Sequence, residues 1–237
     1  MEFIQAVKDA NLEIYKLINS TSHEKLCENT KVGIGGDLGI VIDCEAEKIF
    51  AKHLLKFGKI YSEESGYIGD NENTIILDPI DGSENFKSNI PYFGTSVALK
   101  QNEKITDAIT TNLVNGDMFI KTDDTFIKAS IFNNEKKYLQ ISKLNTIGIF
   151  EKAYNSHLHS KLKELNLKYR SPGALALSLA ICYEVSFVLF EGKIREFDIA
   201  AGWKMGEELF RFKNDKYLLV SKDKIIFDKI YQLIKKG

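Results

Sequence analysis

The sequence predicts an α+β fold in which helices and strands form layers around a shared core. Three observations support this class: apolar residues recur at helical spacing near the N-terminus, apolar and polar residues alternate over residues 94–129, and helical and extended patterns take turns after residue 156. Layers of both kinds bury each other's apolar faces. We therefore expect a single domain over residues 1–237, with an N-terminal lobe of about 1–147 and a C-terminal α/β lobe of about 148–237.

Composition places the chain among ordinary globular proteins. Of its 237 residues, 44% are apolar and 27% are charged, against averages of about 45–50% and about 25%. Disordered, collagen-like and coiled-coil classes are thereby excluded. Lys plus Arg number 32 and Asp plus Glu 33, for a net charge of −1, so no overall basic field points to nucleic acid or to a membrane surface as a partner.

The cysteines and the apolar runs indicate a cytoplasmic protein. The three cysteines stand far apart without a C-x-x-C pair, which fits neither a zinc ribbon nor a disulfide framework. Charged residues begin at Glu2, so no secretory signal is expected. Residues 173–190 carry a single charge, at Glu184, but a span needs about 20 apolar residues. The texture of this run also changes midway, which predicts a buried helix followed by a buried strand.

The first part of the chain predicts two helices joined by a glycine-rich segment. Apolar residues at spacings of three and four mark one helix over 3–18 and another from about 43 to 58. The glycines of residues 31–43 indicate a loop or flap, and they lack the G-x-G-x-x-G spacing of a dinucleotide site. Short β-rich runs at 59–61 and 74–77 each lead into acidic residues.

The second part predicts a β-meander followed by alternating elements. Residues 94–129 alternate in three passes separated by the turn signals QNE and NG, which is typical of antiparallel strands. After residue 156, the pattern predicts helices at 156–166, 173–184, 199–210 and 225–234, and strands at 167–170, 185–190 and 217–220.

The most informative motif follows the strand at 74–77. Asp78 and Asp81 flank the carbonyl of Ile80, and these oxygens form a compact ligand set for a hard cation such as Mg²⁺. Gly82–Ser83 offers backbone N–H groups to a phosphate at the start of a helical turn. An acidic surface turn explains the same residues, because Asp-Pro and Asp-Gly are common turn dipeptides.

Other acidic residues favour the metal-site interpretation. Glu63 and Glu64 follow the strand at 59–61, and Asp198 precedes a stretch of small residues. Alone, the glutamates are explained as solvated and Asp198 as a helix N-cap. Gathered at one point, such carboxylates repel one another and raise each other's pKa values unless cations neutralise them. A cluster of this kind would require at least two metal ions.

The motifs together resemble the inositol monophosphatase superfamily of Mg²⁺-dependent, lithium-sensitive phosphatases. The resemblance covers about residues 1–205 and rests on GGDLGIVIDCEAE (35–47), SEES (62–65), LDPIDGSENF (77–86), RSPGALA (170–176) and EGKIREFDIAAG (191–202). It implies a layered αβαβα sugar-phosphatase fold, two or three Mg²⁺ ions in each active site, a small phosphorylated polyol or sugar as substrate, and a homodimer.

The resemblance also implies roles for individual residues. The metal ligands would be Glu63, Asp78, the carbonyl of Ile80, Asp81 and Asp198. Asp78 would bridge two ions, and the catalytic group would comprise Glu63 with Ser83 and Asp43, the last two orienting the attacking water. The family more often has threonine at the position of Ser83, but the hydroxyl is kept.

Substrate contacts are also implied. Gly82 and Ser83 would hold the phosphate, Glu191 would bind a polyol hydroxyl, and Gly173 with Ala174 would line the alcohol side. Arg170 and Arg195 fall inside the matching motifs, and a second phosphate would favour such guanidinium groups. Surface pairing explains either arginine equally well. Two departures are Phe197 in place of the usual tryptophan and a short segment after Gly202.

These observations define a leading hypothesis and its alternatives. The first is Mg²⁺-dependent hydrolysis of myo-inositol monophosphate or a related polyol or sugar phosphate. The alternatives are a fructose-1,6-bisphosphatase or bifunctional enzyme and a 3′-phosphoadenosine 5′-phosphate phosphatase. A non-catalytic binding module is a fourth hypothesis, which the presence of every predicted metal ligand disfavours.

Overall fold

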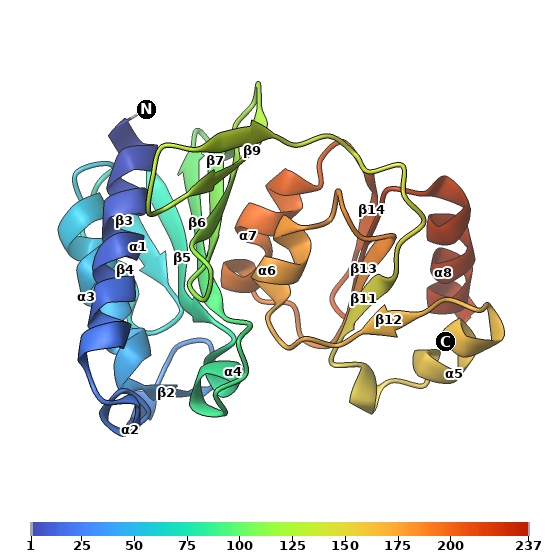
Figure 1. Cartoon of the computed structure of the whole chain (residues 1–237), viewed down its shortest axis with the longest axis horizontal. Coiled ribbons are helices and arrows are strands. Elements are labelled where there is room, and N and C mark those ends of the chain that lie inside the picture. Colours follow the sequence, from blue (N-terminus) through green and yellow to red (C-terminus); the bar gives the residue numbers. More distant parts are fainter. Residues whose placement is uncertain (1, 237) are drawn as a thin grey trace.

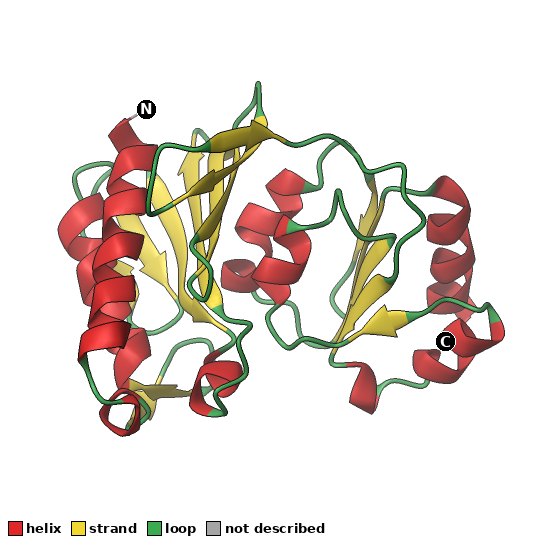
Figure 2. Cartoon of the chain, in the orientation of Figure 1, coloured by secondary structure: helices red, strands yellow, loops and turns green. Residues whose placement is uncertain are grey.

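Helices and sheets stack in five layers in the computed structural model, which describes residues 2–236 (Figures 1 and 2). Residues 1 and 237 of the predicted domain lie outside the described residues. From one side to the other, the layers are a helical pair, an eight-stranded sheet, a second helical pair, a five-stranded sheet and an outer helical layer. The helices of these layers are α1 (Glu2–Ser20) with α3 (Val41–Leu54), α6 (Leu175–Ala180) with α7 (Glu196–Met205), and α5 (Leu158–Glu164) with α8 (Lys224–Lys236). The predicted α+β class and αβαβα layering are confirmed.

The eight-stranded sheet has the order β10-β9-β8-β7-β6-β5-β3-β4. Only β3 and β5 pair in parallel within it, among the described residues. Its strands are β3 (Lys59–Ser62), β4 (Gly66–Ile68), β5 (Thr74–Asp81), β6 (Gly94–Gln101), β7 (Lys104–Asn112), β8 (Asp117–Lys121), β9 (Phe126–Ser130) and β10 (Lys136–Tyr138).

The predicted meander has one strand more than expected. The pass predicted over 117–129 is a hairpin, because the chain turns between Thr122 and Thr125, where the amide of Thr122 donates to the carbonyl of Thr125 at 2.9 Å. The sequence TDDT at this turn continues the polar side of the alternation, so periodicity did not reveal it. The prediction of three passes was therefore wrong, and the segment contributes β8 and β9.

The five-stranded sheet has the order β12-β11-β13-β15-β14. Its strands are β11 (Gly148–Glu151), β12 (Tyr169–Arg170), β13 (Phe187–Glu191), β14 (Phe210–Lys213) and β15 (Tyr217–Ser221). The helix predicted over 199–210 begins at Glu196 and ends at Met205 instead. Its expected last turn is absent because Phe210 begins β14, which pairs antiparallel with β15 and needs an extended backbone.

Short elements fill the edge beside the first helical layer. The glycine-rich segment predicted as a loop or flap is mostly a hairpin of β1 (Asn29–Val32) and β2 (Leu38–Ile40). Its turn is closed by a hydrogen bond from the amide of Gly33 to the carbonyl of Asp37 at 3.0 Å. The remaining short helices are α2 (His23–Leu26), α4 (Ser83–Lys87) and the 3-10 helix η1 (Ala153–Asn155).

Three apolar cores hold the layers together, and the second of them lies on both faces of the α6–α7 layer. Strand β5 contributes to two of them, because neighbouring side chains of a strand point to opposite faces. Leu77 packs with α1 and α3, whereas Ile76 packs with α6 and α7. The third core joins the five-stranded sheet to α5 and α8. Strand β5 is thus held on both faces, which gives its acidic end a rigid support.

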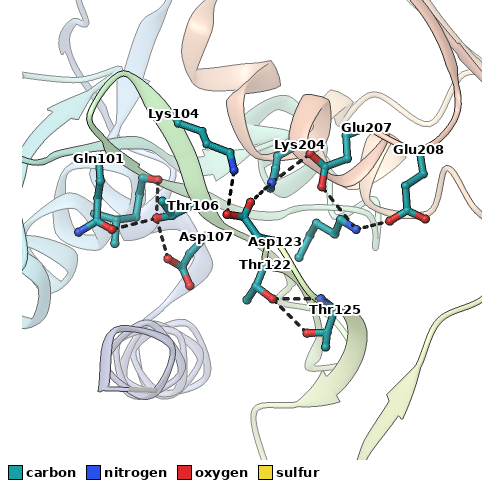
Figure 3. Close-up of polar contacts among 12 residues, drawn as sticks. Gln101, Lys104, Thr106, Asp107, Thr122, Asp123, Thr125, Lys204, Glu207 and Glu208 are labelled. Atoms are coloured by element: carbon teal, nitrogen blue, oxygen red, sulfur yellow. Dashed lines mark hydrogen bonds and ion pairs between the residues drawn. The ribbon is translucent and has the colours of Figure 1, made fainter.

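A network of charged side chains anchors the C-terminal end of α7 to the β8–β9 hairpin (Figure 3). The ammonium of Lys204 lies 2.6 Å from Asp123 and 3.0 Å from Glu207. The ammonium of Lys121 lies 2.5 Å from Glu208 and 3.5 Å from Glu207. Both lysine side chains are buried. Their charges are compensated by Asp123 of the N-terminal lobe and by Glu207 and Glu208 of the C-terminal lobe. We call these five residues the lysine network.

The apolar run over 173–190 is buried inside the protein, as expected. It forms α6 and most of β13, and side chains such as Leu179 and Val188 are fully buried against other elements. Within residues 2–236, no helix combines the length and the apolar character needed to cross a bilayer.

Candidate active site

The two aspartates of the DPIDGS motif lie at the end of β5, which continues four residues beyond the predicted run of 74–77. Asp78 pairs with Ser96 and Asp81 with Gly94, so the register of β5 against β6 shifts between them. Residues three apart in a regular strand would point to opposite faces. The irregularity at Pro79 and Ile80 changes this alternation, as bulges do next to many active sites.

Three carboxylates converge beside this strand end. Glu63, Asp78 and Asp198 each place an oxygen within 4.8 Å of the others. All three are largely buried, and one oxygen of Asp78, Oδ1, has no hydrogen-bond partner among the described residues. Burial, followed by the charge of Glu63, raises the pKa of Asp78 well above its usual value. Burial likewise raises the pKa of Glu63 to about 7.

Asp81 is buried next to these three residues but is held in a different way. Its Oδ2 accepts a hydrogen bond of 2.8 Å from the backbone N–H of Leu177, in the first turns of α6. Burial raises the pKa of Asp81, and the charges of Asp198, Glu151 and Glu63 raise it further. The hydrogen bond fixes the orientation of this carboxylate relative to the rest of the site.

Asp198 and Glu63 are joined by the guanidinium of Arg195. Its Nε and Nη2 lie 2.9 and 3.0 Å from the two oxygens of Asp198, and Nη1 lies 2.5 Å from Oε1 of Glu63. The same Nη1 lies 2.7 Å from Asp37 in the β1–β2 turn. Arg195 therefore neutralises part of the acidic cluster and connects it to the glycine-rich hairpin.

The interpretation of Asp198 as a helix N-cap was wrong. Arg195 occupies the N-cap position of α7, and Asp198 is the third residue of the helix. At this place a carboxylate still interacts favourably with the helix N-terminus. The glycine-rich hairpin also reaches the site, since a side chain at Gly35 would put its Cβ 2.5 Å from Oε1 of Glu63. A larger residue at position 35 would have to displace the side chain of Glu63.

Asp43 and Ser83 form a hydrogen-bonded pair at the edge of the cluster. The hydroxyl of Ser83 lies 2.9 Å from Oδ1 of Asp43 and 3.0 Å from the carbonyl oxygen of Ile80. The other oxygen of Asp43 accepts from the amide of Ile40 at 2.8 Å, at the start of α3. Burial raises the pKa of Asp43 to about 6. The structure thus brings the predicted water-orienting pair and the predicted carbonyl ligand into direct contact.

The residues predicted to bind substrate are not all gathered here. Gly82 precedes the first residue of α4, has a φ of 91° and lies near Ala174. Arg170 is exposed and donates to the carbonyl of its neighbour Tyr169 at 2.9 Å. Both oxygens of Glu191 are engaged within the C-terminal lobe, with Ser156, Tyr217 and Lys216 as partners.

Several buried or partly buried polar residues near the site were not among the predicted site residues. Glu151, Ser178 and Tyr92 form hydrogen bonds behind the segment of Gly173 and Ala174. Glu64 is buried next to Glu63, and burial raises its pKa to about 7. Nothing in the local sequence around Glu151 marks it as special, because its partners lie more than 20 residues away.

The donor set fits a divalent cation. Clustered carboxylate oxygens with a carbonyl oxygen nearby are the ligands that hard cations prefer, and the orphaned Oδ1 of Asp78 needs a positively charged or hydrogen-bonding partner. Within the cluster, Arg195 supplies such a partner to Glu63 and Asp198 but not to Asp78. A cation bound by those two residues would therefore have to share them with the guanidinium.

A layered αβαβα fold with buried carboxylates at the end of a central strand is the architecture of a class of phosphomonoester phosphatases that depend on metal ions. Comparison with known proteins identifies the group within that class. The model of the inositol monophosphatase family matches residues 2–209. This chain therefore belongs to the inositol monophosphatase family.

Relatives within the family carry different names. The chain is 26% identical to the Nus factor SuhB of Xylella fastidiosa, over 86% of this chain and 77% of that protein. It is 29% identical to the bifunctional NADP phosphatase/NAD kinase of Methanococcus maripaludis, over 90% of this chain but only 42% of that longer protein. It is 26% identical to inositol monophosphatase 2 of Saccharomyces cerevisiae, over 87% and 81%.

Solved structures show the same fold. The crystal structure of an inositol monophosphatase-fructose 1,6 bisphosphatase superposes with a TM-score of 0.79 at 23% identity, covering 98% of this chain and 100% of the other. The Thermotoga maritima IMPase superposes with a TM-score of 0.77 at 18% identity, covering 100% and 99%. The relatives therefore share an architecture while their names point to several substrates.

Proposed function

We propose that this protein hydrolyses small phosphomonoesters in a Mg²⁺-dependent reaction, with myo-inositol monophosphate or a related polyol or sugar phosphate as substrate. The observation that carries the proposal is the convergence of Glu63, Asp78 and Asp198 within 4.8 Å, beside the hydrogen-bonded pair of Asp43 and Ser83. Family membership supports the reaction type.

In this proposal, Glu63, Asp78, Asp81, Asp198 and the carbonyl of Ile80 hold two or three Mg²⁺ ions. Bound there, the ions would supply water activation and charge stabilisation for displacement at phosphorus. The burial of the carboxylates serves this binding, because a low dielectric strengthens their attraction for a cation.

The chain's own groups orient the reactants. Asp43 accepts a hydrogen bond from Ser83, which leaves the lone pairs of the hydroxyl oxygen to hold the attacking water. The backbone at Gly82 and Ser83 faces the phosphate in this arrangement. Gly173 and Ala174 form the wall on the alcohol side, where the methyl group of Ala174 would lie 3.1 Å from a Cβ at Gly82.

The test is phosphate release by the purified protein with and without Mg²⁺. Myo-inositol 1-phosphate, fructose 1,6-bisphosphate, NADP and 3′-phosphoadenosine 5′-phosphate would be offered side by side. We expect Mg²⁺-dependent release with preference for the first. Release from none of the four compounds would contradict the proposal and support a binding module instead.

Preference for fructose 1,6-bisphosphate would be the second outcome to examine. It would require Arg170 or Arg195 to contact the second phosphate. Arg195 is close enough to the cluster to do so, but its guanidinium already bonds to Asp198 and Glu63. Arg195→Lys would separate the two substrates: we expect it to weaken bisphosphate turnover more than monophosphate turnover, because lysine lacks the planar fork.

Three further features stay predictions: a homodimer and inhibition by lithium, which the family resemblance implies, and a cytoplasmic location, which the cysteines and the apolar runs indicated. Light scattering on the eluting peak of a size-exclusion column would measure the first, and activity at increasing Li⁺ the second. Fractionation of cells would measure the third. Each is independent of the substrate assignment.

A further inference from the structure

Glu151 is a deeply buried acid that the proposed mechanism does not use. It ends strand β11, and only 2% of its surface is exposed. Its Oε2 accepts a hydrogen bond of 2.9 Å from the amide of Gly173, and its Oε1 accepts one of 2.6 Å from the hydroxyl of Ser178. Both oxygens are thus directed at the beginning of α6. No lysine or arginine pairs with this carboxylate within residues 2–236.

These bonds belong to a closed circuit of hydrogen bonds. The hydroxyl of Ser178 lies 3.3 Å from that of Tyr92. The side-chain amide of Asn85 donates to the carbonyls of Tyr92 and Pro172, at 2.7 Å in each case. Pro172 precedes Gly173, which closes the circuit. We call this set the hydrogen-bond ring: Glu151, Gly173, Pro172, Asn85, Tyr92 and Ser178.

The hydrogen-bond ring depends on a glycine at position 173. Gly173 has a φ of +91°, and a Cβ there would lie 3.1 Å from Oδ1 of Asn85. Asn85 itself belongs to α4, directly after the DPIDGS motif. The ring therefore joins the C-terminal lobe to the acidic strand end through one buried side chain from each. The side chains of Glu151, Asn85 and Ser178 are buried, whereas Gly173 lies at the surface. Buried polar groups whose hydrogen bonds are made are held rigidly.

The ring reaches a predicted metal ligand through α6. Glu151 fixes the residues on both sides of the helix start, Gly173 and Ser178. Between them, Leu177 donates its amide to Oδ2 of Asp81 at 2.8 Å. If the start of α6 moves, this donor moves, and the free oxygen of Asp81 turns with it. Partners that orient a ligand commonly affect metal affinity as much as activity.

We propose that Glu151 is a positioning residue for Asp81: through Gly173 and Ser178 it holds the start of α6, and the Leu177 amide then sets the direction of the Asp81 carboxylate. The inference rests on the proposed function for its metal and its reaction. It assigns to Glu151 no contact with substrate.

The side-chain chemistry gives a sharp test. Glu151→Ala removes both acceptors. In Glu151→Gln, the amide oxygen accepts from Gly173 while the amide NH₂ donates to Ser178, whose hydroxyl can then donate to Tyr92. The glutamine variant therefore keeps the ring and removes only the charge. Ser178→Ala removes two bonds of the ring, to Glu151 and to Tyr92, while the carboxylate of Glu151 and its bond from the amide of Gly173 stay in place.

The matched control is Ser221→Ala. Ser221 is also buried, and its hydroxyl donates to the carbonyl of Ser186 at 2.7 Å, but it lies in the five-stranded sheet away from the ring. For each variant three quantities would be measured: the Mg²⁺ concentration that half-saturates the thermal shift, kcat and KM for the preferred substrate, and hydrogen exchange at the Leu177 amide.

For Glu151→Ala we expect the half-saturating Mg²⁺ concentration to rise and kcat to fall, each by about tenfold or more, with faster exchange at Leu177. Glu151→Gln should stay within about threefold of the wild type, and Ser178→Ala should lie between the two. Ser221→Ala should lower stability alone.

Two results would overturn the inference: Mg²⁺ and kcat values for Glu151→Ala that match those of Ser221→Ala, or equal losses in the alanine and glutamine variants. Should Glu151→Ala not fold, Ser178→Ala and Glu151→Gln decide by the same criteria. A wild-type protein without phosphatase activity would contradict the proposed function, whereas the Mg²⁺ shift and the Leu177 exchange would still test the role of Glu151.

Discussion

The acidic cluster and the lysine network are two groups of charges attached to opposite ends of α7. In the cluster, the buried carboxylates of Glu63, Asp78 and Asp198 face one another with Arg195 as the positive partner that the structure supplies. In the lysine network, the buried ammonium groups of Lys121 and Lys204 each meet two acids within 3.5 Å.

The pKa values reflect this difference. Burial raises the pKa values of Glu63 and Asp78, whereas hydrogen bonds from Lys104 and Lys204 lower the pKa of Asp123 to about 2. Uncompensated buried charge is unfavourable for folding, and compensated charge is close to neutral or favourable. The comparison teaches that a region which keeps unfavourable charge is adapted to bind something, while a balanced region serves the fold.

The largest expected effect is that of Asp78→Asn. We expect turnover to fall by at least about 1,000-fold, or about 4 kcal/mol of barrier, because the proposed bridging ligand is lost. At the same time, the melting temperature without Mg²⁺ should rise, since one repelling charge is removed. Calorimetry and phosphate release measure the two effects. Asp70→Asn, at an exposed site, is the control, and an active Asp78→Asn enzyme would contradict the assignment.

Mg²⁺ itself should stabilise the protein. At a concentration of 100 times its dissociation constant, a ligand that binds only the native state adds about 2.7 kcal/mol to the free energy of unfolding. We expect this shift in the wild type and its disappearance in Asp78→Asn, measured by thermal unfolding with Mg²⁺ or with EDTA. A wild-type melting temperature that is indifferent to Mg²⁺ would refute a metal site in the cluster.

Within the lysine network, Lys204→Met should destabilise the protein by about 2 kcal/mol, because its charged hydrogen bonds to Asp123 and Glu207 are lost. Methionine keeps the apolar stem of the side chain, so the loss reports on the charge. Urea unfolding measures it. An unchanged midpoint would show that the buried network contributes nothing to stability.

The smallest effect is expected at Lys104, the exposed partner of Asp123. The side chain of Lys104 is 64% exposed although its ammonium lies 2.8 Å from Asp123. Lys104→Ala should therefore change the free energy of unfolding by about 0.5 kcal/mol or less, since surface ion pairs are weak. The same urea titration compares it with Lys204→Met, and a loss equal to that of the buried lysine would remove the distinction between them.

The sequence predicted those helices and strands whose apolar pattern repeats within a single segment of the chain. The apolar spacing of α1 and α3 and the alternation of β6 and β7 are visible in the chain itself, and the structure has these elements near the predicted bounds. The motif around Asp78 and Asp81 indicated the acidic end of strand β5, since a strand followed by a tight turn is also a local feature. That these oxygens bind metal stays a prediction.

Features that depend on distant partners were missed. Lys204 and Asp123 stand 81 residues apart, so no pattern in either segment predicts that they meet. The same holds for Glu151, whose partners Gly173 and Ser178 lie 22 and 27 residues further along the chain. The end of the helix predicted over 199–210 was wrong for a related reason: pairing of Phe210 with Ser221 in another strand overrides the local pattern.

Helix α7 has a consequence for how this protein could change over evolutionary time. The helix carries Asp198 in its first turn and Lys204 near its last. Its ten residues, about 15 Å in length, therefore connect the acidic cluster to the β8–β9 hairpin. If the cluster acts as proposed, a substitution in the β8–β9 turn that displaces Lys204 would also move Asp198, although the turn lies at the other end of the helix from the cluster. Variants of this turn would then alter the geometry of the site while every proposed metal ligand is kept.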